Sequence, residues 1–370
     1  MKKIRTWLIF LPLFFSSCSS HNSFQFLVGT YTDDSSQGIN HIKYNSITNE
    51  INTESVISDI NNPSFVITNK KKSFVVSVEE TASNEGGKIT SYSYNIRTNK
   101  FEKLSSFFTK GDHPCTIALS PEEDFVVVGN YSGGNLSVFP IDKSGKLSSH
   151  INFIQHFGKS KNIDRQEKPH VHSIVFHPKE NKIFIIDLGT DTIEIVPFQE
   201  TSKSFLQTDK SVLVNVPKGS GPRHLIFSKD GSKAFSTFEL TNEIGFFEYK
   251  NNQLTLVQKV KIALDETQNG SAAEVRLSKD EKYIYASVRG NDNFIAVLKF
   301  DETKKLQIIQ KVPTSKTPRN FILTNNDETV LVANQNSNSI LIFKRNKKTG
   351  LLTATSSEFS VNKPVYFCAF

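Results

Sequence analysis

The chain has few of the residues that build covalent or metal-dependent frameworks. It contains three Cys, one Met and one Trp in 370 residues, and no Cys-x-x-Cys pair. A disulfide scaffold or a cysteine zinc site is therefore not indicated. Cys115 and Cys368 fall in apolar strand patterns. Free buried thiols are the simpler interpretation, although a disulfide between them would need only that their Cα atoms come close.

Motifs for several common chemistries are also absent. No Gly-x-Ser-x-Gly sequence is present, so a serine nucleophile has no support. The pairs Gly86-Gly87 and Gly133-Gly134 fit hairpin turns, because neither opens a helix as a phosphate-binding loop must. The formal net charge is +7, but its Lys and Arg residues are scattered through turns. Without a continuous basic face, no nucleic-acid partner is predicted.

The one long apolar run lies near the N-terminus. Basic residues precede apolar residues 7–15, which predicts a signal peptide over residues 1–17 rather than a membrane span. Cys18 follows small residues in a pattern that resembles the lipobox of bacterial lipoproteins, although Phe15 stands where Leu is usual. On this interpretation Cys18 carries a lipid and residues 18–23 form a tether. The protein is then a lipoprotein of the cell envelope, facing the periplasm or held at the outer membrane. Ordinary cleavage with an incidental cysteine is the alternative.

A period of about fifty residues runs through the rest of the chain. A polar lead-in, a short apolar strand and a tight turn recur, most clearly at residues 219–231. The residues that begin the next strand of each unit lie 47 to 58 positions apart: Phe26, Phe74, Phe125, Ile183, Ala234, Tyr283 and Val330. Four short strands per unit and 30 Phe predict an all-β protein. The predicted fold is a single seven-bladed β-propeller over residues 24–370.

The two ends of the chain complement each other. Phe26 begins a unit that lacks a first strand, and residues 364–370 form a first strand that lacks a unit. Joined, they would complete a seventh blade and close the ring, which removes most exposed sheet edge. The longest interval, before Ile183, contains an insertion over residues 158–168. We expect a loop with a functional role there.

Propeller geometry brings polar residues from distant parts of the chain to one place. The first strand of each blade is innermost and the second is antiparallel to it, so first-strand starts and second-strand ends meet at one channel mouth. The candidate catalytic residues there are Glu274, His172, Arg223, His224 and Arg289, and the candidate substrate-binding residues are Arg319, Glu239, Asn130, His170, Asn334 and Gln335. Arginine forks suit carboxylate or phosphate, and a carboxylate or imidazole among arginines can act as a general base. The site is predicted to take an anionic, oxygen-rich small molecule.

Purely structural interpretations of these residues remain open. Arg223 could pair with Glu239, and Arg289 with Glu274, as salt bridges that only align the ring. His170 and His172 alternate along one strand, but no carboxylate or cysteine completes a zinc set. Neither a metal nor a cofactor is therefore predicted.

The same residues resemble the lactonase family of seven-bladed propellers, which includes 6-phosphogluconolactonase-like enzymes. Residues 165–172 and 219–224 are the most specific matches, and weaker ones span nearly the whole mature chain in order. The resemblance implies hydrolysis of a sugar δ-lactone to the open hydroxy acid by activated water, without a cofactor. It makes Glu274 or His172 the base, Arg223 and Arg319 the clamp for the carbonyl or a phosphate, and Arg289 with His224 the donors to the oxyanion. Two residues depart from the pattern. Thr116 stands where the family often has a histidine after the cysteine, and Ala273 stands where neighbouring blades have arginine.

The predicted export conflicts with a phosphorylated sugar lactone, which belongs to cytoplasmic metabolism. The substrate is then another lactone, or the fold has a changed activity. A propeller that binds a sugar acid or glycan without turning it over is the alternative function, followed by a structural interaction platform. Fold alone does not separate these functions.

Overall fold

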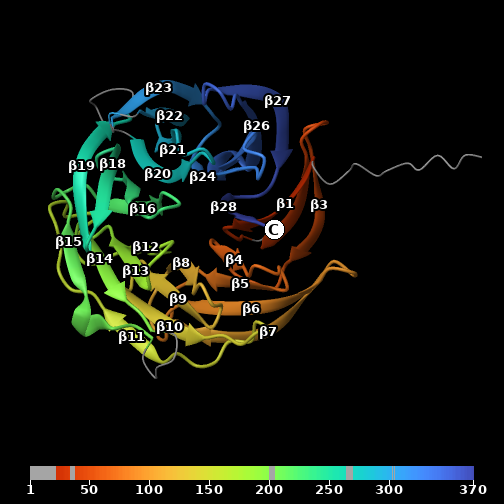
Figure 1. Ribbon diagram of the computed structural model, residues 1–370. Coiled ribbons are helices and arrows are strands. Elements are labelled where there is room, and N and C mark those ends of the chain that lie inside the picture. Colours follow the sequence, from red (N-terminus) through yellow and green to blue (C-terminus); the bar gives the residue numbers. More distant parts are fainter. Residues whose placement is uncertain (1–21, 34–37, 200–204, 264–269, 302, 304) are drawn as a thin grey trace, which may run out of the picture.

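The computed structural model of the protein describes residues 22–33, 38–199, 205–263, 270–301, 303 and 305–370. Seven four-stranded antiparallel sheets stand around a central axis as the blades of a propeller (Figure 1). The helices of the described residues are two single 3₁₀ turns, η1 (Thr208–Lys210) and η2 (Gln335–Ser337). The predicted all-β, seven-bladed fold is confirmed. The predicted signal peptide and the lipidation site Cys18 lie outside the described residues.

Six blades follow one another along the chain, each with its first strand nearest the axis (Figure 1). The first three are β4 (Val66–Thr68), β5 (Phe74–Glu79), β6 (Lys88–Asn95) and β7 (Lys100–Phe108); β8 (Pro114–Leu119), β9 (Phe125–Asn130), β10 (Asn135–Pro140) and β11 (Asn152–Gln155); and β12 (Val171–Phe176), β13 (Lys182–Asp187), β14 (Thr192–Pro197) and β15 (Val212–Asn215). The next three are β16 (Pro222–Phe227), β17 (Lys233–Phe238), β18 (Glu243–Lys250) and β19 (Gln253–Lys261); β20 (Gly270–Leu277), β21 (Tyr283–Gly290), β22 (Phe294–Phe300) and β23 (Leu306–Pro313); and β24 (Pro318–Leu323), β25 (Thr329–Asn334), β26 (Ser339–Arg345) and β27 (Leu352–Ser360).

The remaining blade is built from both ends of the chain. β28 (Pro364–Ala369) pairs antiparallel with β1 (Ser23–Thr30), which continues into β2 (Ile39–Asn45) and β3 (Glu50–Ile57). The predicted ring closure is confirmed, and it leaves the innermost edge of this sheet to the last strand of the chain. Because Ser23 already pairs in β1, the predicted tether over residues 18–23 extends one residue too far.

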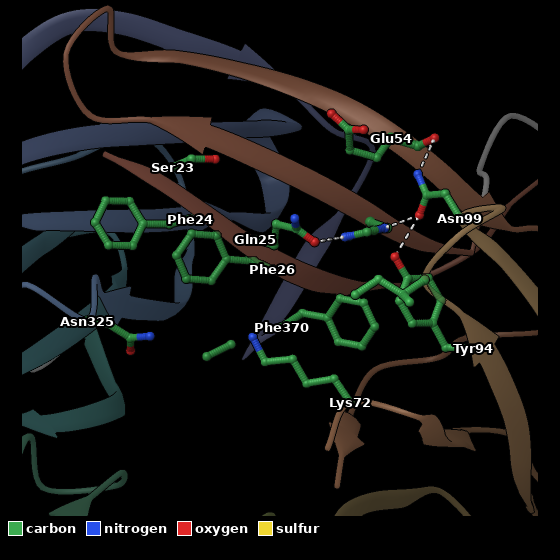
Figure 2. Close-up of a pocket in the computed structure, with 13 residues that line it drawn as sticks. Ser23, Phe24, Gln25, Phe26, Glu54, Lys72, Tyr94, Asn99, Asn325 and Phe370 are labelled. Carbon is green, nitrogen blue, oxygen red and sulfur yellow. Dashed lines mark hydrogen bonds between the residues drawn. The ribbon is translucent and has the colours of Figure 1, made fainter. Parts of the chain in front are cut away.

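Side chains of two neighbouring blades meet at this closing seam. The ring of Phe370 lies 4.7 Å from that of Tyr94, measured between centroids. Figure 2 shows Gln25 and Asn99 on either side of the same hollow, and both hydrogen-bond to the buried imidazole of His41, at 3.0 Å each. The contacts join residues from β1, β2, the β6–β7 hairpin and the chain end, so the seam is tied by side chains as well as by the β1–β28 ladder.

The hydrophobic core is divided into clusters between adjacent blades. In one cluster, Phe125 and Val127 of β9 pack with Ile183 and Ile185 of β13. Second and third strands supply most of the fully buried apolar side chains, since both of their faces are covered. The axis is therefore free for polar side chains from the first strands.

A β-bulge recurs near the start of six first strands. The pairing register shifts there, so that residues of the first strand lack a single opposite partner. A bulge re-aims a side chain and leaves the bulged residue outside the ladder. The residues at the shifts are Cys115, His172, Arg223 with His224, Ala273 with Glu274, Arg319 and Val365. They include every first-strand residue that the sequence analysis predicted at the channel mouth: His172, Arg223, His224, Glu274 and Arg319.

Candidate active site

A cavity of about 200 Å³ lies on the axis at the predicted mouth. First strands contribute Cys115, His172 and Arg319, and second-strand ends contribute Glu80, Tyr131, Glu239 and Arg289. Arg165 reaches the same cavity from the loop before β12. The structure thus brings together four of the predicted site residues: His172, Arg289, Arg319 and Glu239.

Glu239 is the charged centre of the cavity wall. Its carboxylate is 2% exposed and accepts hydrogen bonds from Arg165 Nη2 at 2.7 Å and Arg289 Nη2 at 3.2 Å. Arg223 Nε lies 2.9 Å from the same carboxylate. Burial alone would raise the pKa of Glu239, but the charges of Arg289, Arg223 and Arg165 outweigh it and lower the pKa to about 2. Glu239 is therefore a fixed anion that holds three arginines in place.

These contacts test the two salt bridges that the sequence suggested. The pairing of Arg223 with Glu239 is present. Arg289 does not pair with Glu274, because its guanidinium bonds to Glu239 instead. The second strands of neighbouring blades converge at their ends. Arg289 at the end of β21 therefore meets Glu239 after β17, and not Glu274 on the first strand of its own blade.

His172 is a buried imidazole in the cavity wall. It is 6% exposed, and its Nδ1 is buried without a hydrogen-bond partner among the described residues. Burial is the main cause that lowers the pKa of His172 well below the usual value of 6.5, and the charge of Arg223 lowers it further. A buried imidazole that stays neutral at physiological pH keeps a lone pair for proton transfer.

Glu80, Tyr31 and Arg319 form a chain of hydrogen bonds across the cavity. Arg319 Nη2 donates to the Tyr31 hydroxyl at 2.8 Å, and that hydroxyl donates to Glu80 Oε1 at 2.9 Å. The guanidinium of Arg319 also lies 5.1 Å from the centroid of the Tyr31 ring. Burial raises the pKa of Tyr31, which keeps the phenol neutral. The second oxygen of Glu80, Oε2, is buried without a hydrogen-bond partner among the described residues and is an acceptor in the cavity wall.

Comparison with known proteins identifies the family of this site. A family model described as lactonase, 7-bladed beta-propeller, matches residues 25–369.

The chain belongs to the lactonase family.

The 6-phosphogluconolactonase of Bacillus subtilis strain 168 is 29% identical over 343 residues, which covers 91% of this chain and 96% of that protein. Among solved structures, the periplasmic gluconolactonase of Pseudomonas aeruginosa has a TM-score of 0.87 and 29% identity, covering 93% of this chain and 98% of the other. A Bacteroides fragilis NCTC 9343 protein has a TM-score of 0.88 and 33% identity, covering 95% and 98% of the two chains. The protein is thus a lactonase, an enzyme that hydrolyses lactones as carboxylic esters.

In this lactonase, Glu274 lies below the cavity and does not line its wall. Glu274 lines a separate hollow of about 450 Å³ that first strands form around the axis. Its carboxylate lies 3.2 Å from His224 Nδ1 and 3.4 Å from Arg276 Nη2, and it also accepts a hydrogen bond from the Asn320 amide. Burial raises its pKa, but the charge of Arg276 and the hydrogen bond from His224 lower it to about 2. The Glu274 carboxylate is therefore ionised, and its oxygens are already occupied by these partners.

His224 and Arg223 connect the two levels of the axis. Arg223 Nη1 donates to the backbone oxygen of Ala273 at 2.9 Å and lies 3.0 Å from His224 Nε2. Burial lowers the pKa of His224, so the ring is neutral and its Nδ1–H donates to Glu274. With this tautomer, His224 Nε2 accepts from Arg223. Glu274 thus orients His224, which in turn orients Arg223.

Three predicted substrate-binding residues of the lactonase lie outside the cavity wall. Asn130 and Asn334 are fully buried at blade junctions, where Asn130 donates to Asn135 and Asn334 accepts from Thr314. His170 lies behind Tyr131, with ring centroids 4.4 Å apart and Nδ1 2.9 Å from the Tyr131 backbone oxygen. Asn130 and Asn334 are the last residues of β9 and β25, and His170 directly precedes β12. Gln335 differs, because it lines a groove outside the cavity.

This groove is about 400 Å³ and opens from the cavity to the surface. It shares Arg165, Glu239, Arg289 and Arg319 with the cavity. Its other lining residues are Gly270, Ser271, Gly290, Thr317 and Gln335. Ser271 Oγ and Gln335 Oε1 are buried without hydrogen-bond partners among the described residues. The groove therefore offers polar atoms and arginines to a substrate that extends beyond the cavity.

Sequence reasoning missed Arg165, Glu80 and Tyr31 as site residues. Glu80 and Tyr31 directly follow β5 and β1, the second strands of their blades. Arg165 lies in the insertion that was predicted to be functional, and its Nη2 reaches Tyr131 at 3.2 Å. Cys115 lines the cavity as a buried free thiol, and Cys368 is free but only partly buried. The prediction of free thiols is therefore confirmed, and the prediction of burial holds for Cys115 alone.

The described residues contain no group of three His, Cys, Asp or Glu side chains placed to hold a metal ion. In the same part of the chain, no helix is long and apolar enough to cross a lipid bilayer.

Proposed function

We propose that the lactonase hydrolyses a sugar δ-lactone that carries an anionic tail, with His172 as general base. The observation that carries this proposal is the buried neutral imidazole of His172 in a cavity whose wall holds arginines. Water addition to a lactone carbonyl requires a base that takes a proton from water and donors that stabilise the oxyanion. This cavity holds an imidazole and cationic hydrogen-bond donors close together.

The reaction follows from the positions of these groups. Water lies between His172 and the free oxygen of Glu80, and His172 accepts its proton as the oxygen attacks the lactone carbonyl. The carbonyl becomes a tetrahedral oxyanion beside Arg319, whose guanidinium is held by a neutral phenol rather than by a carboxylate. The carbon–oxygen bond of the ring then breaks, and the imidazolium returns its proton to the departing ring oxygen. The product is the open hydroxy acid.

The substrate is larger than the inner cavity. Sites for drug-sized ligands measure roughly 300–1,000 Å³, whereas the cavity alone measures about 200 Å³. The outer groove supplies the remaining space, and Arg165, Arg289 and Arg319 line both volumes. Arginine forks favour phosphate or carboxylate. We assign the cavity to the lactone ring and the groove to the anionic tail, as in a 6-phosphogluconolactone-like substrate.

Location at the cell envelope is part of the proposal. The basic and apolar residues before Cys18 support export and lipid attachment, and the relative from Pseudomonas aeruginosa is a periplasmic gluconolactonase. The substrate then is a lactone present outside the cytoplasm.

Proton release by the purified protein tests the activity. δ-Gluconolactone and its 6-phosphate are compared above their spontaneous hydrolysis rates, with His172→Asn as the test variant and His150→Asn as the matched control. His150 packs against Phe139, away from the cavity. We expect kcat to fall by roughly 10²- to 10⁴-fold in His172→Asn and to stay unchanged in the control. An equal rate in both variants would remove His172 from the chemistry, and no hydrolysis of either lactone by the folded wild type would refute the proposal.

A further inference from the structure

Four apolar side chains of the described residues are more than 70% exposed, and they form two pairs on opposite faces of the ring. Ile47 and Ile96, exposed by 71% and 81%, lie in the β2–β3 and β6–β7 hairpins. Phe157 and Ile163, exposed by 84% and 82%, lie in the loop that carries Arg165 to the cavity. Single exposed apolar residues are common on protein surfaces, but covering such a side chain removes apolar area from water and is favourable.

The first pair lies where the chain enters the propeller. The backbone nitrogen of Ser46, next to Ile47, donates to the backbone oxygen of Asn22 at 2.9 Å. Ile96 lines the same hollow of about 400 Å³ as Ser23 and Phe24. Figure 2 shows Ser23, Phe24 and Lys72 around this hollow. The described part of the chain therefore begins, at Asn22, beside Ile47 and Ile96.

Basic side chains surround this apolar pair. The exposed residues Lys70, Lys71 and Lys72 form the β4–β5 turn, and Arg97 and Lys100 lie in the hairpin that carries Ile96. Exposed carboxylates lie here too, at Glu50, Glu54 and Glu102, and Glu123 accepts a hydrogen bond from the Lys70 backbone nitrogen at 2.7 Å. The β4–β5 turn nevertheless presents three consecutive exposed lysines, and such a cluster of one sign favours an anionic partner.

Strand β1 fixes the direction of this face relative to the active site. It begins at Ser23 beside the basic turn and ends at Thr30, directly before Tyr31, whose hydroxyl binds Arg319 in the cavity. Eight residues at about 3.3 Å each span roughly 25 Å. The face with Ile47 and Ile96 is therefore the one opposite to the cavity mouth.

We propose that this face, defined by Ile47, Ile96 and Lys70 to Lys72, rests on an anionic lipid surface and turns the active site away from the bilayer. Apolar tips enter the interface between headgroups and acyl chains, and lysines attract anionic headgroups. The surface contacts do not depend on catalysis. Lipid attachment at Cys18 would favour the same orientation. Cys18 is four residue steps from Asn22, a distance of at most about 14 Å along the chain. Such a short tether would hold this face, and no other, against the membrane.

Vesicle co-sedimentation tests the proposal without the lipid anchor. Residues 22–370 contain the complete closed ring, so this unlipidated propeller is mixed with phosphatidylcholine vesicles, with and without phosphatidylglycerol. We expect binding to the anionic vesicles that falls with added salt. One lysine near such a surface contributes about fivefold to partitioning, so Lys71→Gln with Lys72→Gln should weaken binding on the order of twenty-fold. Ile47→Ser with Ile96→Ser should weaken it too.

The matched control lies on the opposite face. Phe157→Ser with Ile163→Ser removes the same kind of exposed side chain beside the cavity mouth, and it should leave vesicle binding unchanged. Equal or greater loss in this control would overturn the proposed orientation. No binding of the wild-type propeller to anionic vesicles would overturn the proposed surface. All three substitution sets fall on exposed hairpins or loops, and equal melting temperatures confirm that each variant is folded.

Discussion

Replacing Glu239 with glutamine removes the one charge that three arginines share while keeping the side-chain shape. Wild-type Glu239 has its pKa lowered from 4.5 to about 2 by Arg289, Arg223 and Arg165, against the opposing effect of burial. Each pKa unit corresponds to about 1.4 kcal/mol, so the ionised carboxylate contributes on the order of 3 kcal/mol to the free energy of unfolding. Removing one partner of a buried ion pair costs roughly 3–5 kcal/mol in other proteins, which agrees with this estimate.

The pH dependence gives the sharper test. A depressed folded-state pKa means that the contribution is complete above the unfolded pKa and is lost as pH falls through the folded pKa. The stability difference between wild type and Glu239→Gln should therefore be largest near pH 7 and should shrink between about pH 4.5 and pH 2. Glu274 also has a lowered pKa, but it titrates in both proteins and cancels in the difference.

Urea unfolding followed by far-ultraviolet circular dichroism measures the difference at pH 7 and pH 3. Glu328→Gln is the matched control, since Glu328 pairs with Lys347 at 2.6 Å but is half exposed. We expect the control to change stability by less than about 1 kcal/mol. A Glu239→Gln protein as stable as wild type at pH 7, or one whose deficit is the same at both pH values, would refute the electrostatic argument.

Four further changes separate the roles of the other residues. Glu274→Gln should lower the free energy of unfolding by about 2–4 kcal/mol, because Arg276 and His224 lose a buried anion; a stable variant with no turnover would instead make Glu274 the base. Arg165→Ala should raise KM for the phosphorylated lactone about tenfold with little change in melting temperature, since Arg165 is partly exposed; an unchanged KM would remove it from the groove. Tyr31→Phe leaves Arg319 and Glu80 without their shared partner and should lower kcat/KM, measured by proton release, more than it lowers stability. Deleting residues 364–370 removes β28 and should abolish cooperative thermal unfolding, so a normal melting curve would contradict ring closure.

The fold could be predicted because propeller repeats are local patterns. Each blade carries its own apolar strands and turn residues, and blades differ little in what they require, so a period of about fifty residues identified the architecture. Closure was predictable for the same reason, because a missing first strand at one end matched a spare strand at residues 364–370.

The site was predictable in part, since alignment gives the register of a strand but not the length or path of a loop. His172, Arg289, Arg319 and Glu239 followed from the register alone. Arg165 did not, because its position depends on how the insertion folds back to Glu239.

The sequence by itself determined the fold class, the closure of the ring and the concentration of arginine, histidine and glutamate at one end of the axis. These features follow from the repeat, because equivalent strand positions recur at nearly fixed spacing in each blade. Only the tertiary structure decided how the charges are distributed among those slots. The sequence predicts Glu239 and Glu274 at the same channel mouth, yet Glu239 holds the cavity wall through three arginines and Glu274 lies below it against Arg276 and His224. The difference arises because β-bulges and strand twist set the height of each side chain along the axis, and the energy of a buried charge depends on which partners lie within a few ångströms.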